Sequence, residues 1–197
     1  LIAATSAQPL HGGATMIAFG VGTMPAMVMT GLGAAQLSSL MRRRGDGFGV
    51  QQVAAVLLDA EAPLYYHYQS GAINESYADV FGELIDLAHV GGKDTSWAEW
   101  KIGEDTPIGA FRDMRDPTRY GHPDRVRSPL WHTKTSDDGG VHRNSGVGNK
   151  AAYLMAVGGR FRGYAIKGIG KERTARVWYQ ALTTRLTSAA NYIDLAD

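Results

Sequence analysis

Residues 71–88 read GAINESYADVFGELIDLA, and apolar side chains recur along this stretch at the spacing of an α-helix. They would form one stripe, made of Ile73, Tyr77, Val80, Phe81, Leu84, Ile85 and Ala88. Glu75, Asp79 and Asp86 mark another face of the same helix. The stretch therefore predicts a long amphipathic helix that buries one face and carries acidic groups on another.

Two further helices are predicted downstream. One begins at about Asn149 and ends at Gly158 and Gly159, because consecutive glycines suit a helix stop. The other runs from about Lys171 to Leu186. Its expected buried stripe consists of Ala175, Val177, Trp178, Ala181, Leu182 and Leu186. Residues 91–140, between the first two helices, are rich in Asp, Pro and Gly and are predicted to form a long loop, which usually carries function or is held by a bound ion. The pattern is typical of a mainly α-helical domain.

The composition excludes several classes of function. The chain has 197 residues, of which 44% are apolar, enough to bury the core of one ordinary domain. Twenty basic residues against 19 acidic ones leave a net charge of +1, so we expect no nucleic-acid partner. The absence of cysteine excludes disulfides, thiol catalysis and Cys-based metal sites. Metal chemistry would have to use His, Asp and Glu.

The front of the chain differs from the rest. The first 41 residues contain no charged side chain, and Arg42, Arg43 and Arg44 then follow together. Residues 14–41 therefore resemble a membrane segment with a positive flank, but their glycines and Pro25 keep the hydrophobicity moderate. We do not expect a membrane span there, and no secretory signal is recognisable. Residues 1–63 stay unassigned, and residues 64–197 are predicted to form the domain.

Two groups of residues could carry chemistry. Glu75 and Asp79 are four apart on one helix face, where two carboxylates repel unless a cation or a proton lies near them. They are either a solvated acidic face or a metal-ligating carboxylate with its supporting partner. His142 follows two glycines, and Asp137 could accept a hydrogen bond from one of its ring nitrogens. The other nitrogen could then donate to developing negative charge, although a structural histidine is the alternative.

Four motifs, in this order, resemble the C-terminal half of the thermolysin family of secreted zinc endopeptidases. They are YYHYQSGAINESYADVFGELIDL (65–87), WKIGED (100–105), FRDMRDPTRYGHPDR (111–125) and DDGGVHRNSGVGNKAAYLM (137–155). The resemblance covers about two thirds of the chain. It implies the thermolysin-like C-terminal helical lobe of a zincin metallopeptidase, next to an N-terminal lobe that is not recognisable here.

The resemblance also implies roles for individual residues. His142 would donate a hydrogen bond to the tetrahedral intermediate, oriented by Asp137 and assisted by Tyr66, and Arg112 would hold the substrate carbonyl on the primed side. Glu75 would be the third zinc ligand, and Asp79 would be the partner of a zinc-bound histidine. Asp86 and Glu104 fall where the family binds calcium. Lys101 stands where an acid is usual, so we expect one calcium ion at most.

The family's H-E-x-x-H motif, which supplies two zinc ligands and the general base, is missing from this chain. Family spacing would put it at Gln51, Gln52, Val53, Ala54 and Ala55. The six histidines are His11, His67, His89, His122, His132 and His142, and no two of them are four apart. Zinc binding is therefore doubtful, and we expect no hydrolysis by the family's mechanism from the chain as written.

Three interpretations stay open. In the first, the chain is a fragment of an extracellular zinc endopeptidase that cleaves proteins and peptides, with an apolar primed-side preference, and a truncation or reading-frame error has altered its front. In the second, it is a non-catalytic relative that binds peptides in the remaining cleft. In the third, it is a membrane-tethered interaction protein that reuses the helical domain.

Overall fold

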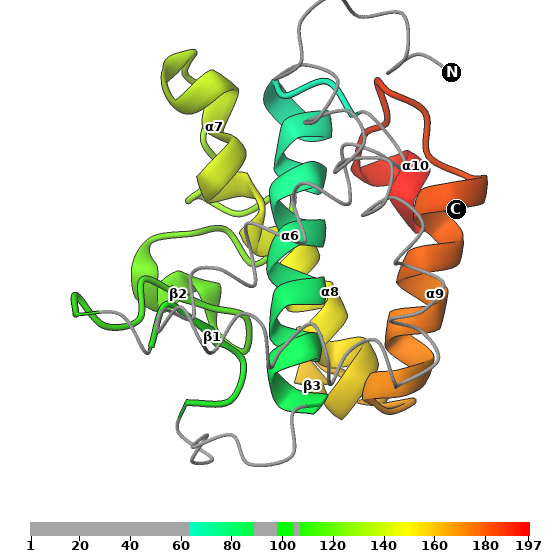
Figure 1. The fold of residues 1–197 in the computed structure, drawn as a ribbon. Helices are drawn as coiled ribbons and strands as arrows, with labels where there is room; N and C mark the ends of the chain where they lie inside the picture. Colours follow the sequence, from blue (N-terminus) through cyan, green and yellow to red (C-terminus); the bar gives the residue numbers. More distant parts are fainter. Residues whose placement is uncertain (1–63, 89–97, 105–106) are drawn as a thin grey trace, which may run out of the picture.

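The computed structural model describes residues 64–88, 98–104 and 107–197. Its central element is helix α6 (Tyr68–Ala88), which the other helices surround (Figure 1). Helices α7 (Ser136–Asn144) and α8 (Gly146–Val157) pack directly against it. Helices α9 (Lys171–Thr184) and α10 (Tyr192–Ala196) complete the bundle on the side opposite α7 (Figure 1).

Short strands connect the helices. Strand β1 (Lys101–Ile102) pairs antiparallel with β2 (Arg112–Asp113), so that Lys101 lies opposite Asp113. The 3-10 helix η1 (Pro117–Tyr120) follows β2. Strands β3 (Gly158–Phe161) and β4 (Tyr164–Lys167) form an antiparallel hairpin between α8 and α9. These strands serve as connections within a helical domain.

The core lies where α6, α8 and α9 meet. Ile73, Tyr77 and Val80 of α6 are fully buried, as the helical spacing predicts. The Tyr77 ring packs edge-on against Trp178 of α9, with 4.7 Å between ring centroids, and its hydroxyl donates a 3.1 Å hydrogen bond to the Trp178 carbonyl oxygen. This contact fixes α9 against α6 with an aromatic pair and a satisfied buried hydroxyl.

The three predicted helices are confirmed, with corrections at their ends and faces. Helix α6 starts at Tyr68, α8 starts at Gly146, and α9 ends at Thr184. Val177, predicted to be buried on α9, is 45% exposed, and Thr174 is buried instead. The loop predicted at residues 91–140 contains β1, β2, η1 and the start of α7.

The acidic groups of α6 are not on a solvated face. Asp79 is 2% exposed, so the interpretation of a solvated acidic face is wrong for this residue. A buried carboxylate needs a partner, and the structure supplies one, as described below.

Residues 1–63 lie outside the described part of the chain, and so does the question of a span at residues 14–41. Among the helices that are described, none combines the length and the apolar character needed to cross a bilayer.

Candidate functional site

The first part of α7 turns with the opposite hand to an α-helix. Four consecutive residues have left-handed backbone angles, with φ of 59° at Asp137, 47° at Asp138 and 86° at both Gly139 and Gly140. The glycines are needed for a second reason, because a Cβ at Gly140 would lie 2.7 Å from the His132 ring. The chain then continues as a normal helix through His142.

This turn brings the Asp137 carboxylate back to His142. One carboxylate oxygen lies 2.5 Å from His142 Nδ1, and the other accepts a 3.2 Å hydrogen bond from the His142 backbone N–H. The predicted pairing of Asp137 with a ring nitrogen is confirmed. Because Nδ1 is committed to Asp137, Nε2 is the nitrogen that faces the rest of the site.

Tyr66 joins His142 from the segment just before α6. Its hydroxyl oxygen lies 3.2 Å from His142 Nε2 and also donates a hydrogen bond to Glu75 Oε1. Burial, and then the Glu75 carboxylate, raise the pKa of Tyr66 well above its usual value, so the phenol keeps its proton at neutral pH and acts as a donor. Glu75 Oε2 in turn lies 3.6 Å from His142 Nε2.

Arg112, on β2, is the cation of this site. Its Nη1 atom lies 2.5 Å from Asp79 Oδ2 and 3.7 Å from Glu75 Oε2. Burial alone would lower the pKa of Arg112, but Asp79 and Glu75 outweigh this effect and raise it. The same Asp79 oxygen accepts a 2.8 Å hydrogen bond from the Asn149 side chain on α8. Arg112 and Asn149 therefore neutralise and satisfy a carboxylate that is almost fully buried.

The structure thus gathers six of the predicted residues into one network: Tyr66, Glu75, Asp79, Arg112, Asp137 and His142. Asn149 was not predicted as a member, because an uncharged residue inside a helical motif gives no chemical signal. His122, which was not predicted as a site residue, interacts electrostatically with Arg112 and Asp79. Burial and the nearby Arg112 lower its pKa to about 4.

The residues that the structure describes do not fit a zinc ion. Glu75 lies in the network as one carboxylate with protein partners on both oxygens, and Asp79 is paired with Arg112. Across residues 64–88, 98–104 and 107–197 there is no group of three or more His, Asp or Glu side chains that could hold a metal. Asp86, in the last turns of α6, and Glu104, after β1, belong to no such group either. Calcium binding at these two residues stays a prediction.

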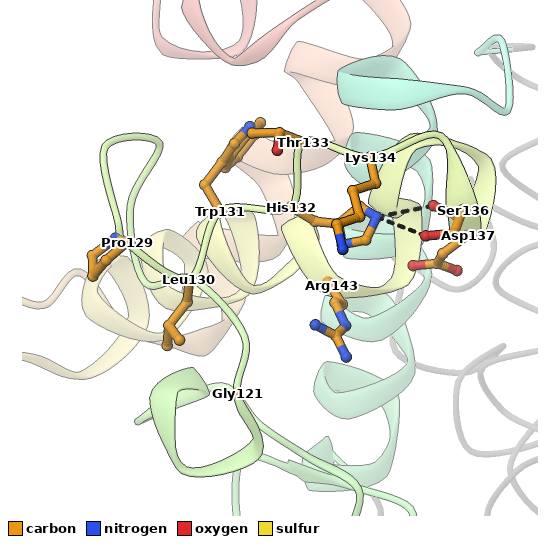
Figure 2. Close-up of a pocket in the computed structure, with 10 residues that line it drawn as sticks. All are labelled: Gly121, Pro129, Leu130, Trp131, His132, Thr133, Lys134, Ser136, Asp137 and Arg143. Carbon is orange, nitrogen blue, oxygen red and sulfur yellow. Dashed lines mark hydrogen bonds between the residues drawn. The ribbon is translucent and has the colours of Figure 1, made fainter.

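A hollow of about 560 Å³ adjoins the network and shares Asp137 with it. Residues 129–134 form much of its wall, with Ser136 and Arg143 nearby (Figure 2). The His132 ring is fixed there, because Nε2 lies 3.1 Å from both the carbonyl and the hydroxyl oxygen of Ser136 (Figure 2).

Fold and site together define a helical lobe that carries a network of acidic, basic and phenolic side chains, and comparison with known proteins gives its family. Residues 62–197 match the family model described as the thermolysin metallopeptidase, alpha-helical domain. The chain therefore belongs to the thermolysin metallopeptidase family, and the predicted resemblance and fold class are confirmed.

Individual proteins that are similar to the chain support this assignment to the family. The chain is 44% identical over 138 residues to a zinc metalloproteinase of Renibacterium salmoninarum, covering 67% of this chain and 25% of that protein. It is 40% identical over 149 residues to a thermolysin of Alicyclobacillus acidocaldarius, covering 73% and 26%. A solved structure, the precursor of protealysin from Serratia proteamaculans, matches with a TM-score of 0.58 and 29% identity, covering 76% of this chain and 48% of that one. The chain spans about a quarter of the length of the curated relatives it matches.

The front of the chain matches a different family. Residues 1–58 match the model described as the cytochrome C biogenesis protein transmembrane region. This match covers less than a third of the chain. The change from one family to the other falls between residues 58 and 62.

Proposed function

We propose that residues 64–197 form the lobe of a metallopeptidase cleft that binds a peptide and polarises its carbonyl, and that the 197-residue chain binds peptides without hydrolysing them. The observation that carries this proposal is the Asp137–His142–Tyr66 arrangement. It supports carbonyl binding because His142 Nε2 and the Tyr66 hydroxyl, two groups able to donate, lie 3.2 Å apart while Asp137 holds the ring.

Each side chain of the site would have a separate role in binding the carbonyl. In its imidazolium form, His142 donates Nδ1–H to Asp137 and Nε2–H toward the substrate oxygen. Tyr66 supplies the second donor when its hydroxyl leaves Glu75 for that oxygen. Arg112 holds Asp79 and Glu75 in place and adds positive charge behind them. Binding and polarisation need only these side chains, whereas hydrolysis also needs an activated water and a base.

The test uses the full chain and a fluorescein-labelled apolar peptide, followed by anisotropy for binding and by chromatography for cleavage. We expect saturable binding with no cleavage, with or without added zinc. His142→Ala should weaken binding at least several-fold, and Thr183→Ala, on the exposed face of α9, is the matched control. Cleavage that a chelator abolishes would contradict the proposal and show that a complete metal site exists.

The match of residues 1–58 bears on the origin of the chain. A segment translated in the wrong frame is not expected to match any protein family. The match therefore favours a coding segment in its own frame over the reading-frame error. Sequencing the DNA upstream of the codon for Leu64 tests this directly, because a frame error predicts nucleotides that encode H-E-x-x-H in another frame.

A second candidate function is attachment to a membrane by the front segment, which its match to a transmembrane-region family favours. The family resemblance instead suggests an extracellular protein. Flotation with liposomes separates the two. Attachment predicts that the full chain floats with the vesicles and that a version beginning at residue 62 does not.

A further inference from the structure

The hollow beside Asp137 has a fixed wall on the side of His132. The side chain of Asn144, which is 1% exposed, accepts a 2.9 Å hydrogen bond from the His132 backbone N–H and donates a 3.1 Å one to its carbonyl oxygen. The ring is held by Ser136 and lies against Gly140. A wall held in this way does not have to be ordered when a ligand binds.

The charges that line the hollow favour an anion. Lys134 and Arg143 both line it, and neither side chain has an ion pair or hydrogen bond with any other residue of the described ranges. Among the described residues of the lining, Asp137 is the one carboxylate, and both its oxygens are engaged by His142. In Figure 2 the Lys134 side chain overlaps the His132 ring in the view, and the Arg143 side chain lies below it. As far as the described part of the chain goes, the hollow therefore has two positive charges without an ionic partner.

The hollow also adjoins the proposed peptide site, with which it shares Asp137. Arg143 follows His142 directly, and Asp137 belongs to both places. Leu130 and Trp131 add apolar surface to the same wall, and Leu130 is 38% exposed. A peptide whose carbonyl is held at His142 would thus pass a surface that offers positive charge together with apolar contact.

We propose that this hollow binds an acidic side chain of the peptide held at His142, so that the lobe prefers peptides with a glutamate or aspartate among apolar residues. The proposal rests on the proposed function and adds its substrate class. Lys134 and Arg143 bind the carboxylate, and Leu130 contacts the apolar neighbour. The recognition is charge-assisted, so it weakens as salt screens the charges.

The experiment measures binding of labelled apolar hexapeptides in which one glutamate is moved through every position, each beside its glutamine counterpart. We expect at least one glutamate peptide to bind the full chain about five- to tenfold tighter than its glutamine counterpart at low salt. The difference should shrink at high salt. In the Lys134→Gln/Arg143→Gln double variant, the two peptides should bind about equally, and binding of the glutamine peptide should not change.

The matched control is Lys167→Gln/Arg173→Gln, which removes the same charge from two exposed residues outside the hollow. It should keep the preference for glutamate. If the control loses the preference as well, or if the glutamate and glutamine peptides bind the unaltered chain equally, the inference is wrong while the proposed function stands. If neither peptide binds at all, the proposed function fails and the inference fails with it.

Discussion

Arg112 is the charged partner of Asp79 among the residues that the structure describes. The resemblance implies a zinc-bound histidine next to Asp79, and the chain has no such histidine at the expected positions. In the structure the guanidinium is bonded to Asp79, with 2.5 Å between Nη1 and Oδ2. A charge this well buried is tolerated only because it is paired.

Replacing Arg112 with methionine should therefore destabilise the fold. Asp79 would keep Asn149 as its only partner among those the structure shows, and the uncompensated charge should lower the free energy of unfolding by about 3 kcal/mol. Arg176→Met is the control, because its pair with Glu172 is exposed and should contribute less than about 1 kcal/mol. Urea unfolding of both variants measures the difference, and equal losses would contradict this account.

His122 should make stability depend on pH. Its pKa is lowered from 6.5 to about 4 in the folded chain, first by burial and then by Arg112. As the pH falls, His122 is protonated in the unfolded chain before it is protonated in the folded chain. Its contribution to the free energy of unfolding is therefore fully present above about pH 6.5 and is lost as the pH falls toward 4. The slope from this residue is at most about 1.4 kcal/mol per pH unit. His122→Gln should flatten the urea-derived stability curve over this window, and an unchanged slope would contradict the lowered pKa.

The sequence predicted the Asp137–His142 pair because both residues belong to one motif, five positions apart, with glycines between them. It could not predict the pairing of Arg112 with Asp79, which are 33 positions apart in sequence. Local spacing defines neighbours within one turn, whereas such a contact depends on how β2 packs against α6.

Among the elements, the three helices with apolar periodicity were predicted, and those without it were missed. Strand β3 begins at the glycines that were interpreted only as a helix stop, and β4 follows it at Tyr164; strands this short give little alternation. Helix α10 could have been found, because Asn191 and Asp194 form a capping box, which is a recognisable start signal.

The left-handed turn of α7 should be sensitive to glycine replacement. Gly140→Ala combines an unfavourable φ of 86° with a Cβ placed 2.7 Å from the His132 ring, so we expect a loss of about 2 to 3 kcal/mol. Gly163→Ala is the control, because φ is 89° there but no atom lies within 4 Å of the new Cβ. It should cost only the backbone term of about 1–2 kcal/mol. Thermal and urea unfolding measure both, and equal effects would mean that the close approach to His132 costs nothing.

At the scale of the whole molecule, the mainly helical class followed from the pattern, whereas the arrangement of the helices around α6 followed only from the family resemblance. Periodicity shows which face of a helix is buried but not which helix covers it. The front segment carried no motif, and its similarity to a transmembrane region became evident only through comparison.

The whole domain should fold without a metal. Its core is an apolar cluster built on α6, α8, α9 and α10, and the carboxylates of the site have protein partners. We expect the unfolding temperature measured with a chelator to agree within about 2 °C with that measured in added zinc. Elemental analysis of the purified chain should find no stoichiometric zinc. A chelator-induced fall of several degrees, or one zinc per chain, would contradict this expectation.

The left-handed turn also limits how the sequence can drift. Residues other than glycine, asparagine and aspartate are strongly disfavoured at such backbone angles, so only a few residue types are tolerated from Asp137 to Gly140. That restriction acts through the backbone and persists whether or not the site performs any chemistry. If the site had no function, exposed His142 should therefore be substituted sooner than Gly139 and Gly140. A histidine retained at this position would indicate selection for function, whereas retained glycines would indicate only selection for the fold.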